Sequence, residues 1–282
     1  MKISPVISFD EFLKIYTHSN VMIFDVSNGK DASVNYRNEH IAGALFVDLD
    51  LQLADIQKDY SMGGRHPLPK IEEFAKILQD MGISKDSYVI IYDDKNSANA
   101  ASRFWWMLKS VGHDKVQVLD GGLNYAKMQK IPMQSGIEPH KRTPVPYPVS
   151  QWNLPTIDIN EMEKIAQNPD YLVIDVRDKE RYEGKHEPID LIAGHIPGAI
   201  NIPFTENLDE NGLFLDPIAL KQKYESICRD IVPENIIVHC GSGVTACHTL
   251  LAFDYAGMEI PRLYVGSWSE WSRNNKAMGK VI

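Results

Sequence analysis

Short apolar runs rich in β-branched and aromatic residues recur along the chain. Between them lie longer stretches whose apolar residues are three or four positions apart, such as 71–81 and 100–111, which is the spacing of helices. The clearest apolar runs, typical of buried strands, are residues 21–26, 89–92, 171–176 and 236–239. Because the two kinds of segment alternate, the pattern predicts parallel βα units and an α/β fold.

The second half of the chain repeats the pattern of the first. The matched segments, in order, are 21–26 with 171–176, 40–44 with 195–199, 89–93 with 236–240, and 116–122 with 262–267. A tandem duplication explains this order, and 282 residues suffice for two domains with separate cores. Several prolines between the halves disfavour a helix there. We therefore expect a domain at residues 1–135, a linker at 136–155 and a second domain at 156–282.

Some polar and glycine residues recur in both halves at matched positions. Residues that both copies share are expected to serve the fold, whereas residues that differ are candidates for chemistry. The shared pairs are His40 with His195, Gly43 with Gly198, and Asp25 with Asp175.

One strand, loop and helix of the second half contains a candidate nucleophile. Cys240 follows the apolar run 236–239, and a helical pattern starts near Val244 after two glycines, Gly241 and Gly243. Both glycines can adopt positive φ, so the loop amides can converge around the sulfur. Amides at a helix N-terminus favour an anion there, which here is the thiolate. We therefore expect Cys240 to be nucleophilic.

Two other interpretations of Cys240 stay open. Most lone cysteines are small buried apolar side chains. Alternatively, a cysteine phosphatase also has its nucleophile in a loop that follows a strand and binds an anion with backbone amides. Such a loop usually includes an arginine that holds phosphate through two hydrogen bonds. Residues 241–246 contain no arginine, so sulfur chemistry is favoured.

The loop sequence His-Cys-Gly-Ser-Gly-Val-Thr-Ala at residues 239–246 resembles the active loop of the rhodanese superfamily, in its 3-mercaptopyruvate sulfurtransferase branch. The resemblance implies tandem rhodanese-like domains, each a mostly parallel five-stranded sheet flanked by helices. Thiosulfate-specific relatives have basic residues directly after the cysteine, whereas an uncharged loop suits a singly charged keto acid. The loop residues implied to bind substrate are Gly241, Gly243, Val244 and Thr245.

An arginine is the expected anchor for a keto acid, because a guanidinium can hold a carboxylate bidentately. Arg181 matches the arginine that family members use; the alternative is a surface arginine paired with Glu180 or Glu183. Relatives commonly have a second arginine in a Glu-Pro-Arg setting, where this chain has Ile189. Either the pocket is less cationic or another residue replaces that arginine. The candidate replacements are Lys185 and His186.

The resemblance also implies a relay of Asp50, His66 and Ser242. Asp50 would orient His66, and His66 with Ser242 would manage the proton of the departing enolate. The alternatives are a solvated loop histidine for His66, and a helix cap or surface carboxylate for Asp50.

The first half has Asp93 at the position of Cys240, in a loop that is about two residues longer and lacks glycine. A carboxylate cannot carry a persulfide. The first domain is therefore expected to be a degenerate copy, and the resemblance implies one active site, in the second domain, facing the interdomain cleft.

Composition and charge exclude several classes of function. The net charge of −9 and pI near 5.5 argue against nucleic acid and anionic membranes as partners. No apolar run approaches the ~20 residues of a membrane span, and the first residues do not resemble a signal peptide. Three cysteines, an odd number, fit a reducing compartment better than a disulfide framework. The nine histidines show no metal-ligand spacing. We expect a soluble cytoplasmic protein without metal or cofactor.

The nucleophilic cysteine and the resemblance to the rhodanese superfamily together imply a two-step sulfur transfer. Cys240 would take the sulfur of 3-mercaptopyruvate as a persulfide, release pyruvate, and pass the sulfur to a thiol, a thioredoxin-like protein or cyanide. The alternatives are a thiosulfate sulfurtransferase, a cysteine phosphatase and a non-enzymatic binding module.

Overall fold

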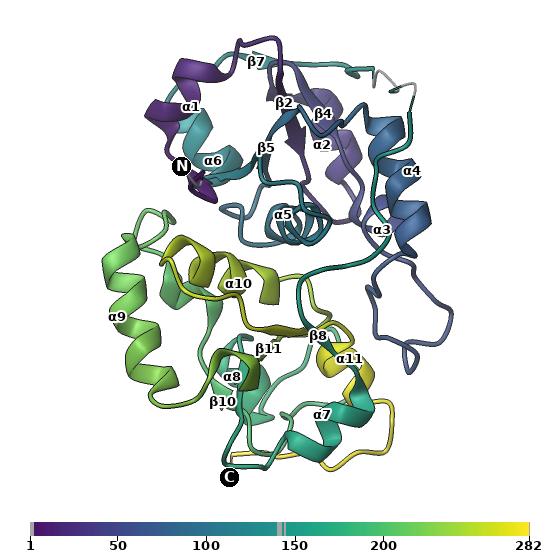
Figure 1. Cartoon of the computed structure of the whole chain (residues 1–282), viewed down its shortest axis with the longest axis vertical. Coiled ribbons are helices and arrows are strands. Elements are labelled where there is room, and N and C mark those ends of the chain that lie inside the picture. The colour runs from purple at the N-terminus through teal and green to yellow at the C-terminus, as the bar shows by residue number, and fades with distance from the viewer. Residues whose placement is uncertain (1–2, 140–142, 144, 282) are drawn as a thin grey trace. The chain divides into compact units, whose positions relative to one another are not determined.

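The computed structural model describes residues 3–139, 143 and 145–281 (Figure 1). These residues form two compact units. Unit 1 comprises residues 3–55, Pro69–Asn153 and Glu210–Phe214, and unit 2 comprises Ile56–Leu68, Leu154–Asp209 and residues 215–281. The segment Ile56–Leu68 thus belongs to unit 2, although it lies in the first half of the sequence.

Unit 1 is built on a sheet of five parallel strands in the order β1-β6-β5-β2-β4. These strands are β1 (Val6–Ile7), β2 (Val21–Asp25), β4 (Ala44–Phe46), β5 (Tyr88–Tyr92) and β6 (Val116–Leu119). The helices are α1 (Phe9–Ile15), α2 (Ala32–Asn38), α3 (Leu49–Gln52), α4 (Ile71–Met81), α5 (Ala100–Ser110) and α6 (Gly122–Met128). Two short strands, β3 (His40–Ile41) and β7 (Met133–Gln134), pair antiparallel beside the main sheet.

Unit 2 contains a second sheet of five parallel strands in the order β8-β12-β11-β9-β10. Its strands are β8 (Thr156–Ile157), β9 (Leu172–Asp175), β10 (Ile200–Asn201), β11 (Ile236–His239) and β12 (Arg262–Tyr264). Its α-helices are α7 (Ile159–Ile165), α8 (Lys179–Glu183), α9 (Pro217–Cys228), α10 (Ala246–Tyr255) and α11 (Ser267–Trp271), and its 3₁₀ turns are η1 (Phe204–Asn207) and η2 (Pro233–Asn235).

The two sheets have the same strand order when their strands are matched along the sequence. β5 and β11 lie at the centre of their sheets, and the loops that follow them begin with Asp93 and Cys240. The register also agrees, since Asp25 lies opposite Tyr92 and Asp175 lies opposite His239. The prediction of a duplicated, parallel α/β fold is therefore confirmed.

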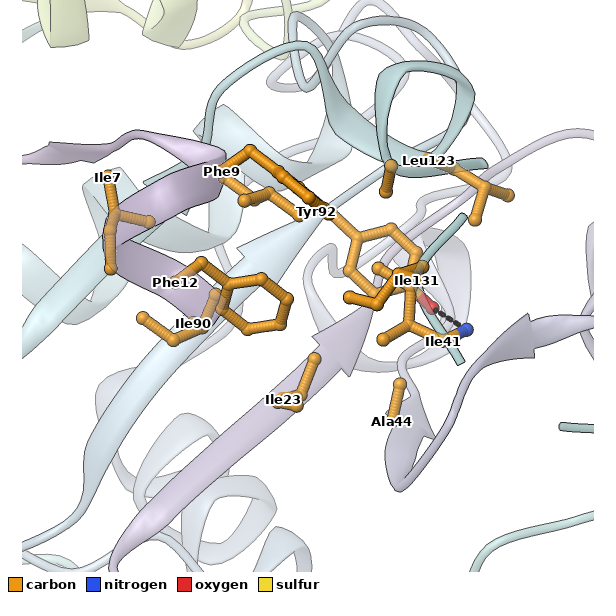
Figure 2. Close-up of a cluster of buried hydrophobic side chains, with 12 residues drawn as sticks. Ile7, Phe9, Phe12, Ile23, Ile41, Ala44, Ile90, Tyr92, Leu123 and Ile131 are labelled. Atoms are coloured by element: carbon orange, nitrogen blue, oxygen red, sulfur yellow. Dashed lines mark hydrogen bonds between the residues drawn. The ribbon is translucent and has the colours of Figure 1, made fainter. Parts of the chain in front are cut away.

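Each sheet is buried because its strands present apolar side chains on both faces. In unit 1, one face packs against α1 and α6 through a cluster that includes Phe12, Ile90 and Leu123 (Figure 2). The backbone N–H of Ile41 donates to the Tyr92 hydroxyl in this cluster (3.1 Å), so the one polar group of that tyrosine is satisfied inside the core.

In unit 2, one face of the sheet packs against α7 and α11. Val173 of β9 and Ile237 of β11 contact a cluster that contains Met162 of α7 and the indoles of Trp268 and Trp271. Helix α10 packs against β11, β12 and the neighbouring helix α9 (Figure 1). The loop after β11 is therefore held between buried elements at the carboxyl edge of the sheet.

The histidines shared by the two halves have the same structural role. His40 Nδ1 donates to the Tyr36 carbonyl oxygen (2.7 Å) and stacks on that ring, and His195 Nδ1 donates to the Tyr182 carbonyl oxygen (2.8 Å) and stacks likewise. Gly198 has φ +90°, and a Cβ there would lie 2.0 Å from the Ala166 carbonyl oxygen. These contacts support the interpretation of the two histidines and Gly198 as scaffold.

The predicted boundaries agree with most observed ones. Helix α4 spans Ile71–Met81, as the pattern predicted, and α5 ends one residue early at Ser110. Helix α10 begins at Ala246, after Val244, because the loop continues through Thr245. No helix among the described residues is both long and apolar enough to cross a membrane.

Candidate active site

Cys240 lies directly after the fully buried strand β11 and is itself only 3% exposed. Its backbone N–H donates to Ser267 Oγ (3.2 Å), and its carbonyl oxygen accepts from the Trp268 N–H (3.1 Å). The strand and the start of α11 therefore fix the cysteine backbone from two sides.

The two glycines of the loop have different roles. Gly243 has φ +73°, and a Cβ there would lie 2.4 Å from the Val265 carbonyl oxygen, so both conformation and space require glycine. Gly241 is not among the positive-φ glycines, and the expectation of positive φ is wrong for it. A Cβ on Gly241 would instead lie 3.1 Å from Arg65 Nη2 and 3.2 Å from Arg181 Nη2. Gly241 thus leaves room for two guanidinium groups beside the loop.

The loop offers backbone donors for an anion. Within the part of the chain that the structure describes, no protein group accepts a hydrogen bond from the amides of Gly241, Ser242, Val244 or Thr245. These amides precede the first turn of α10, where an anion is favoured. The predicted substrate-binding residues of the loop are therefore together, with donors available.

His66 and Ser242 lie within hydrogen-bond distance, with 2.8 Å between His66 Nδ1 and Ser242 Oγ. His66 reaches the loop because its segment is attached to α11. The Gly63 N–H donates to Glu270 Oε1 (2.8 Å), and the Arg65 N–H donates to Ser269 Oγ (3.1 Å). Two members of the predicted relay are therefore brought together within unit 2.

Asp50 belongs to unit 1, in helix α3. The cap of that helix is Asp48, whose Oδ1 accepts the N–H groups of Asp50 (2.8 Å) and Leu51 (3.1 Å). Partial burial, with the charge of Asp48, raises the pKa of the Asp50 carboxyl. The predicted partnership of Asp50 with His66 stays a prediction.

Arg181 extends from the short helix α8 and is held by two carboxylates. Its Nε lies 3.1 and 3.0 Å from the Glu187 carboxylate oxygens, and its Nη2 lies 3.1 Å from Asp190 Oδ2. Burial alone would raise the pKa of Glu187, but hydrogen bonds from Arg181 and from the N–H groups of Asp190 and Ile189 outweigh it and lower that pKa. The alternative pairing with Glu180 or Glu183 does not describe this arginine.

The sequence analysis missed Arg65 and Asp190. The Asp190 carboxylate is fully buried, and it pairs with Arg65 through Oδ1 and with Arg181 through Oδ2. Ile189 is 57% exposed, and Lys185 pairs with Glu183 (2.6 Å) at the surface. The second guanidinium beside the loop therefore comes from Arg65, whose position directly before His66 was the available signal.

A buried ion-pair network supports these residues from the end of β9. Arg177 donates to both carboxylate oxygens of Asp175 (2.6–3.0 Å) and contacts Glu187 through Nη1 (3.3 Å). Burial would raise the pKa of Asp175, but the charges of Arg177 and then His239 lower it. Because Glu187 also holds Arg181, this network orients the arginine beside Gly241.

Unit 1 has its own anion at the matching position. Asp93 is fully buried and accepts N–H groups from Lys95 (2.8 Å), Asn99 (3.0 Å) and Ala101 (3.1 Å). Burial raises its pKa to about 6 against the effect of these hydrogen bonds. The amides that could bind an external anion in this loop are therefore occupied by the protein's own carboxylate.

The other two cysteines are buried. Cys247 is fully buried, and its Sγ donates to the Gly243 carbonyl oxygen (3.4 Å), while burial raises the pKa of Cys228 to about 11. Both are free thiols. The described residues contain no group of three or more metal-ligand side chains placed to hold an ion.

The chain is similar to known proteins over most of its length. The model of the rhodanese-like domain matches the chain twice, over residues 8–128 and 158–274. A probable 3-mercaptopyruvate sulfurtransferase of Pseudomonas aeruginosa is 42% identical over 238 residues, which are 84% of this chain and 82% of that protein. The human 3-mercaptopyruvate sulfurtransferase is 36% identical over 86% of this chain and 80% of its own length. The rat thiosulfate sulfurtransferase is 32% identical over 86% of this chain and 81% of its own length.

Solved structures show the same architecture. The 3-mercaptopyruvate sulfurtransferase of Leishmania major superposes with a TM-score of 0.78 at 28% identity, covering 96% of this chain and 75% of that one. SseA of Escherichia coli, described as a 3-mercaptopyruvate sulfurtransferase, superposes with a TM-score of 0.73 at 28% identity, covering 95% and 100%. With two matched domains that together span most of its length, the chain belongs to the rhodanese family.

Proposed function

We propose that this rhodanese-family sulfurtransferase takes sulfur from 3-mercaptopyruvate through a persulfide on Cys240. The Cys240 thiolate attacks the donor sulfur, the carbon–sulfur bond breaks, and its electron pair remains on pyruvate as an enolate. The enolate takes up a proton to give pyruvate. The outer sulfur of the persulfide then passes to an acceptor thiolate, which restores the Cys240 thiolate.

The observation that supports this proposal is the combination of an uncharged loop with two guanidinium groups at its first glycine. The open amides of Gly241, Ser242, Val244 and Thr245 can hold the anionic sulfur before and after transfer. Glu187 and Asp190 orient the Arg181 guanidinium through Nε and Nη2, and its remaining N–H groups can donate to a carboxylate on the donor. Relatives at 36–42% identity that are named 3-mercaptopyruvate sulfurtransferases support the same donor.

His66 and Ser242 are proposed to manage the proton. Their contact of 2.8 Å lies at the loop, so Ser242 can relay a proton between the donor and His66. Asp50 is proposed to orient His66 as the third member of the relay.

The acceptor is proposed to be a thiol, a thioredoxin-like protein or cyanide, and the location to be the cytoplasm. Three free thiols, one of them the nucleophile, support a reducing compartment. We likewise propose residues 1–135 as the degenerate domain with Asp93, 136–155 as the linker, and 156–282 as the catalytic domain.

Thiosulfate is the second candidate donor. Two guanidinium groups beside Gly241 could also hold a divalent anion, and a thiosulfate sulfurtransferase is among the relatives. A phosphatase is less favoured, because residues 241–246 contain no arginine that could hold phosphate through two hydrogen bonds.

A comparison of donors tests the proposal. Wild-type protein and Cys240→Ser are given 3-mercaptopyruvate or thiosulfate with cyanide, following pyruvate and thiocyanate, while mass spectrometry detects one added sulfur. We expect a higher kcat/KM for 3-mercaptopyruvate and no added sulfur in Cys240→Ser. A preference for thiosulfate would replace the proposed donor, and phosphate release from an aryl phosphate without sulfur transfer would replace the reaction.

A further inference from the structure

Two arginines from distant parts of the sequence meet at the first residue after the nucleophile. Arg65 Nη2 lies 3.1 Å, and Arg181 Nη2 3.2 Å, from the point where a Cβ of Gly241 would stand. Arg181 was expected there, whereas Arg65 comes from the segment Ile56–Leu68, which packs into unit 2.

Asp190 sets the distance between the two guanidinium groups. Its side chain is fully buried, with Oδ1 on Arg65 and Oδ2 on Arg181. The Arg65 side chain keeps 16% of its surface exposed and that of Arg181 keeps 12%, so both can still reach a ligand. A guanidinium has five N–H donors. Arg65 pairs with Asp190, which leaves several donors for a second anion, whereas Arg181 pairs with both Glu187 and Asp190 and keeps fewer.

The charges of this cluster do not cancel. Its ion pairs connect four guanidinium groups with three carboxylates. The cations are Arg65, Arg177, Arg181 and Arg273, and the anions are Asp175, Glu187 and Asp190. In these ion pairs of the described residues one positive charge remains, which is available to an anion at the loop, either the Cys240 thiolate or a bound donor.

The backbone of Arg65 is fixed. Its N–H donates to Ser269 Oγ, and Gly64 before it has φ +80° with no space for a Cβ, which would lie 2.3 Å from the Gly266 carbonyl oxygen. The same segment places His66 on Ser242. One attachment to α11 thus positions both a proton-transfer residue and a cation at the loop.

From these contacts we propose that Arg65, beside Arg181 and across Asp190, is the second anchor of the donor carboxylate. This inference rests on the proposed function. It assigns to Arg65 the charge that Ile189 does not supply.

Arg65→Met, Arg65→Lys and a matched control test the proposal. Arg262 is the control, because its Nη1 also pairs with a carboxylate, Glu161 (2.7 Å), and its side chain is 17% exposed, but it lies on β12 outside the cluster. We expect Arg65→Met to lower kcat/KM for 3-mercaptopyruvate by about 10-fold to 100-fold, mainly through KM. Arg65→Lys keeps the charge but lacks the planar guanidinium fork, so its kcat/KM should lie between those of wild type and Arg65→Met. Arg262→Met should keep a kcat/KM within about twofold of wild type.

A second readout does not depend on the natural donor. Iodoacetate and iodoacetamide alkylate the same thiolate, but only iodoacetate has a carboxylate, and Cys240→Ser gives the background of Cys228 and Cys247. We expect Arg65→Met to lower the iodoacetate rate relative to the iodoacetamide rate by about tenfold. An unchanged iodoacetamide rate shows that the fold and the nucleophile are intact.

The outcomes separate this inference from the proposed function. If wild-type protein does not use 3-mercaptopyruvate but Arg65→Met still lowers the alkylation ratio, the donor is wrong and the anion anchor stands. If the ratio and kcat/KM are unchanged in both Arg65 variants, or fall equally in Arg262→Met, Arg65 is no anchor.

Discussion

Replacing Gly241 with alanine tests whether this glycine exists for space. The added methyl group would lie 3.1 Å from Arg65 Nη2, 3.2 Å from Arg181 Nη2 and 3.4 Å from Asp190 Oδ2. These atoms are at the ends of side chains, so they can move by a few tenths of an ångström. The backbone of Gly241 lies outside the left-handed region, so alanine adds no backbone strain there.

The expected effect of Gly241→Ala is therefore on donor use and not on stability. We expect the free energy of unfolding to stay within about 1 kcal/mol of wild type. Displacing the guanidinium groups weakens a charge-assisted hydrogen bond worth about 1.5–3 kcal/mol, which is about 10-fold to 100-fold in kcat/KM.

Gly243→Ala is the matched comparison in the same loop. The left-handed backbone costs about 1–2 kcal/mol for alanine, and the Cβ would meet the Val265 carbonyl oxygen at 2.4 Å, so the backbone must shift as well. We expect the free energy of unfolding to fall by about 2–4 kcal/mol and Tm to fall by roughly 6–12 °C.

Thermal unfolding and kcat/KM for 3-mercaptopyruvate are measured for both variants, with iodoacetamide alkylation as a check of the thiolate. A wild-type kcat/KM in Gly241→Ala, or a loss of stability as large as that of Gly243→Ala, would contradict the role of Gly241 in leaving space for the two guanidinium groups.

Three further outcomes are expected. His66→Gln should lower kcat roughly 100-fold, measured as pyruvate release, and a wild-type kcat would remove His66 from proton transfer. Burial raises the pKa of Asp93 to about 6, so its contribution to stability is present below about pH 4 and is lost as pH rises through 6, by roughly 3 kcal/mol. The free energy of unfolding in urea should therefore change less between pH 4 and 7 in Asp93→Asn than in wild type. An equal dependence on pH in the two proteins would contradict this. Cys247→Ala should lower the free energy of unfolding by about 1–2 kcal/mol and still form the Cys240 persulfide. Loss of the persulfide would show that Cys247 takes part in sulfur transfer.

Local patterns were sufficient for the elements of the fold. Apolar β-branched runs predicted strands such as β11, and three-to-four spacing predicted α4, because burial on a sheet face and on a helix face imposes those periods. The duplication predicted two copies of one fold, and the two sheets have the same strand order. The start of α10 was placed early, because the loop backbone continues through Thr245.

The candidate site was only partly predictable. Cys240 and Ser242 share one loop, so their proximity follows from the chain itself. Arg65 and Asp190 are 125 residues apart, and no local pattern indicates that they pair. The sequence also could not show why residue 241 is glycine, because the side chains of Arg65 and Arg181 come close to the position that a Cβ would take.

The sequence by itself determined the duplicated α/β fold and a cysteine that follows a strand and precedes a helix, because strand and helix periods and turn chemistry are local. Only the tertiary structure decided that the segment Ile56–Leu68 joins unit 2 and brings Arg65 and His66 to the Cys240 loop. It also decided that Asp93 satisfies its own loop amides in unit 1. Such contacts depend on which buried groups meet after folding, and a buried charge is stable only where a partner is already in place.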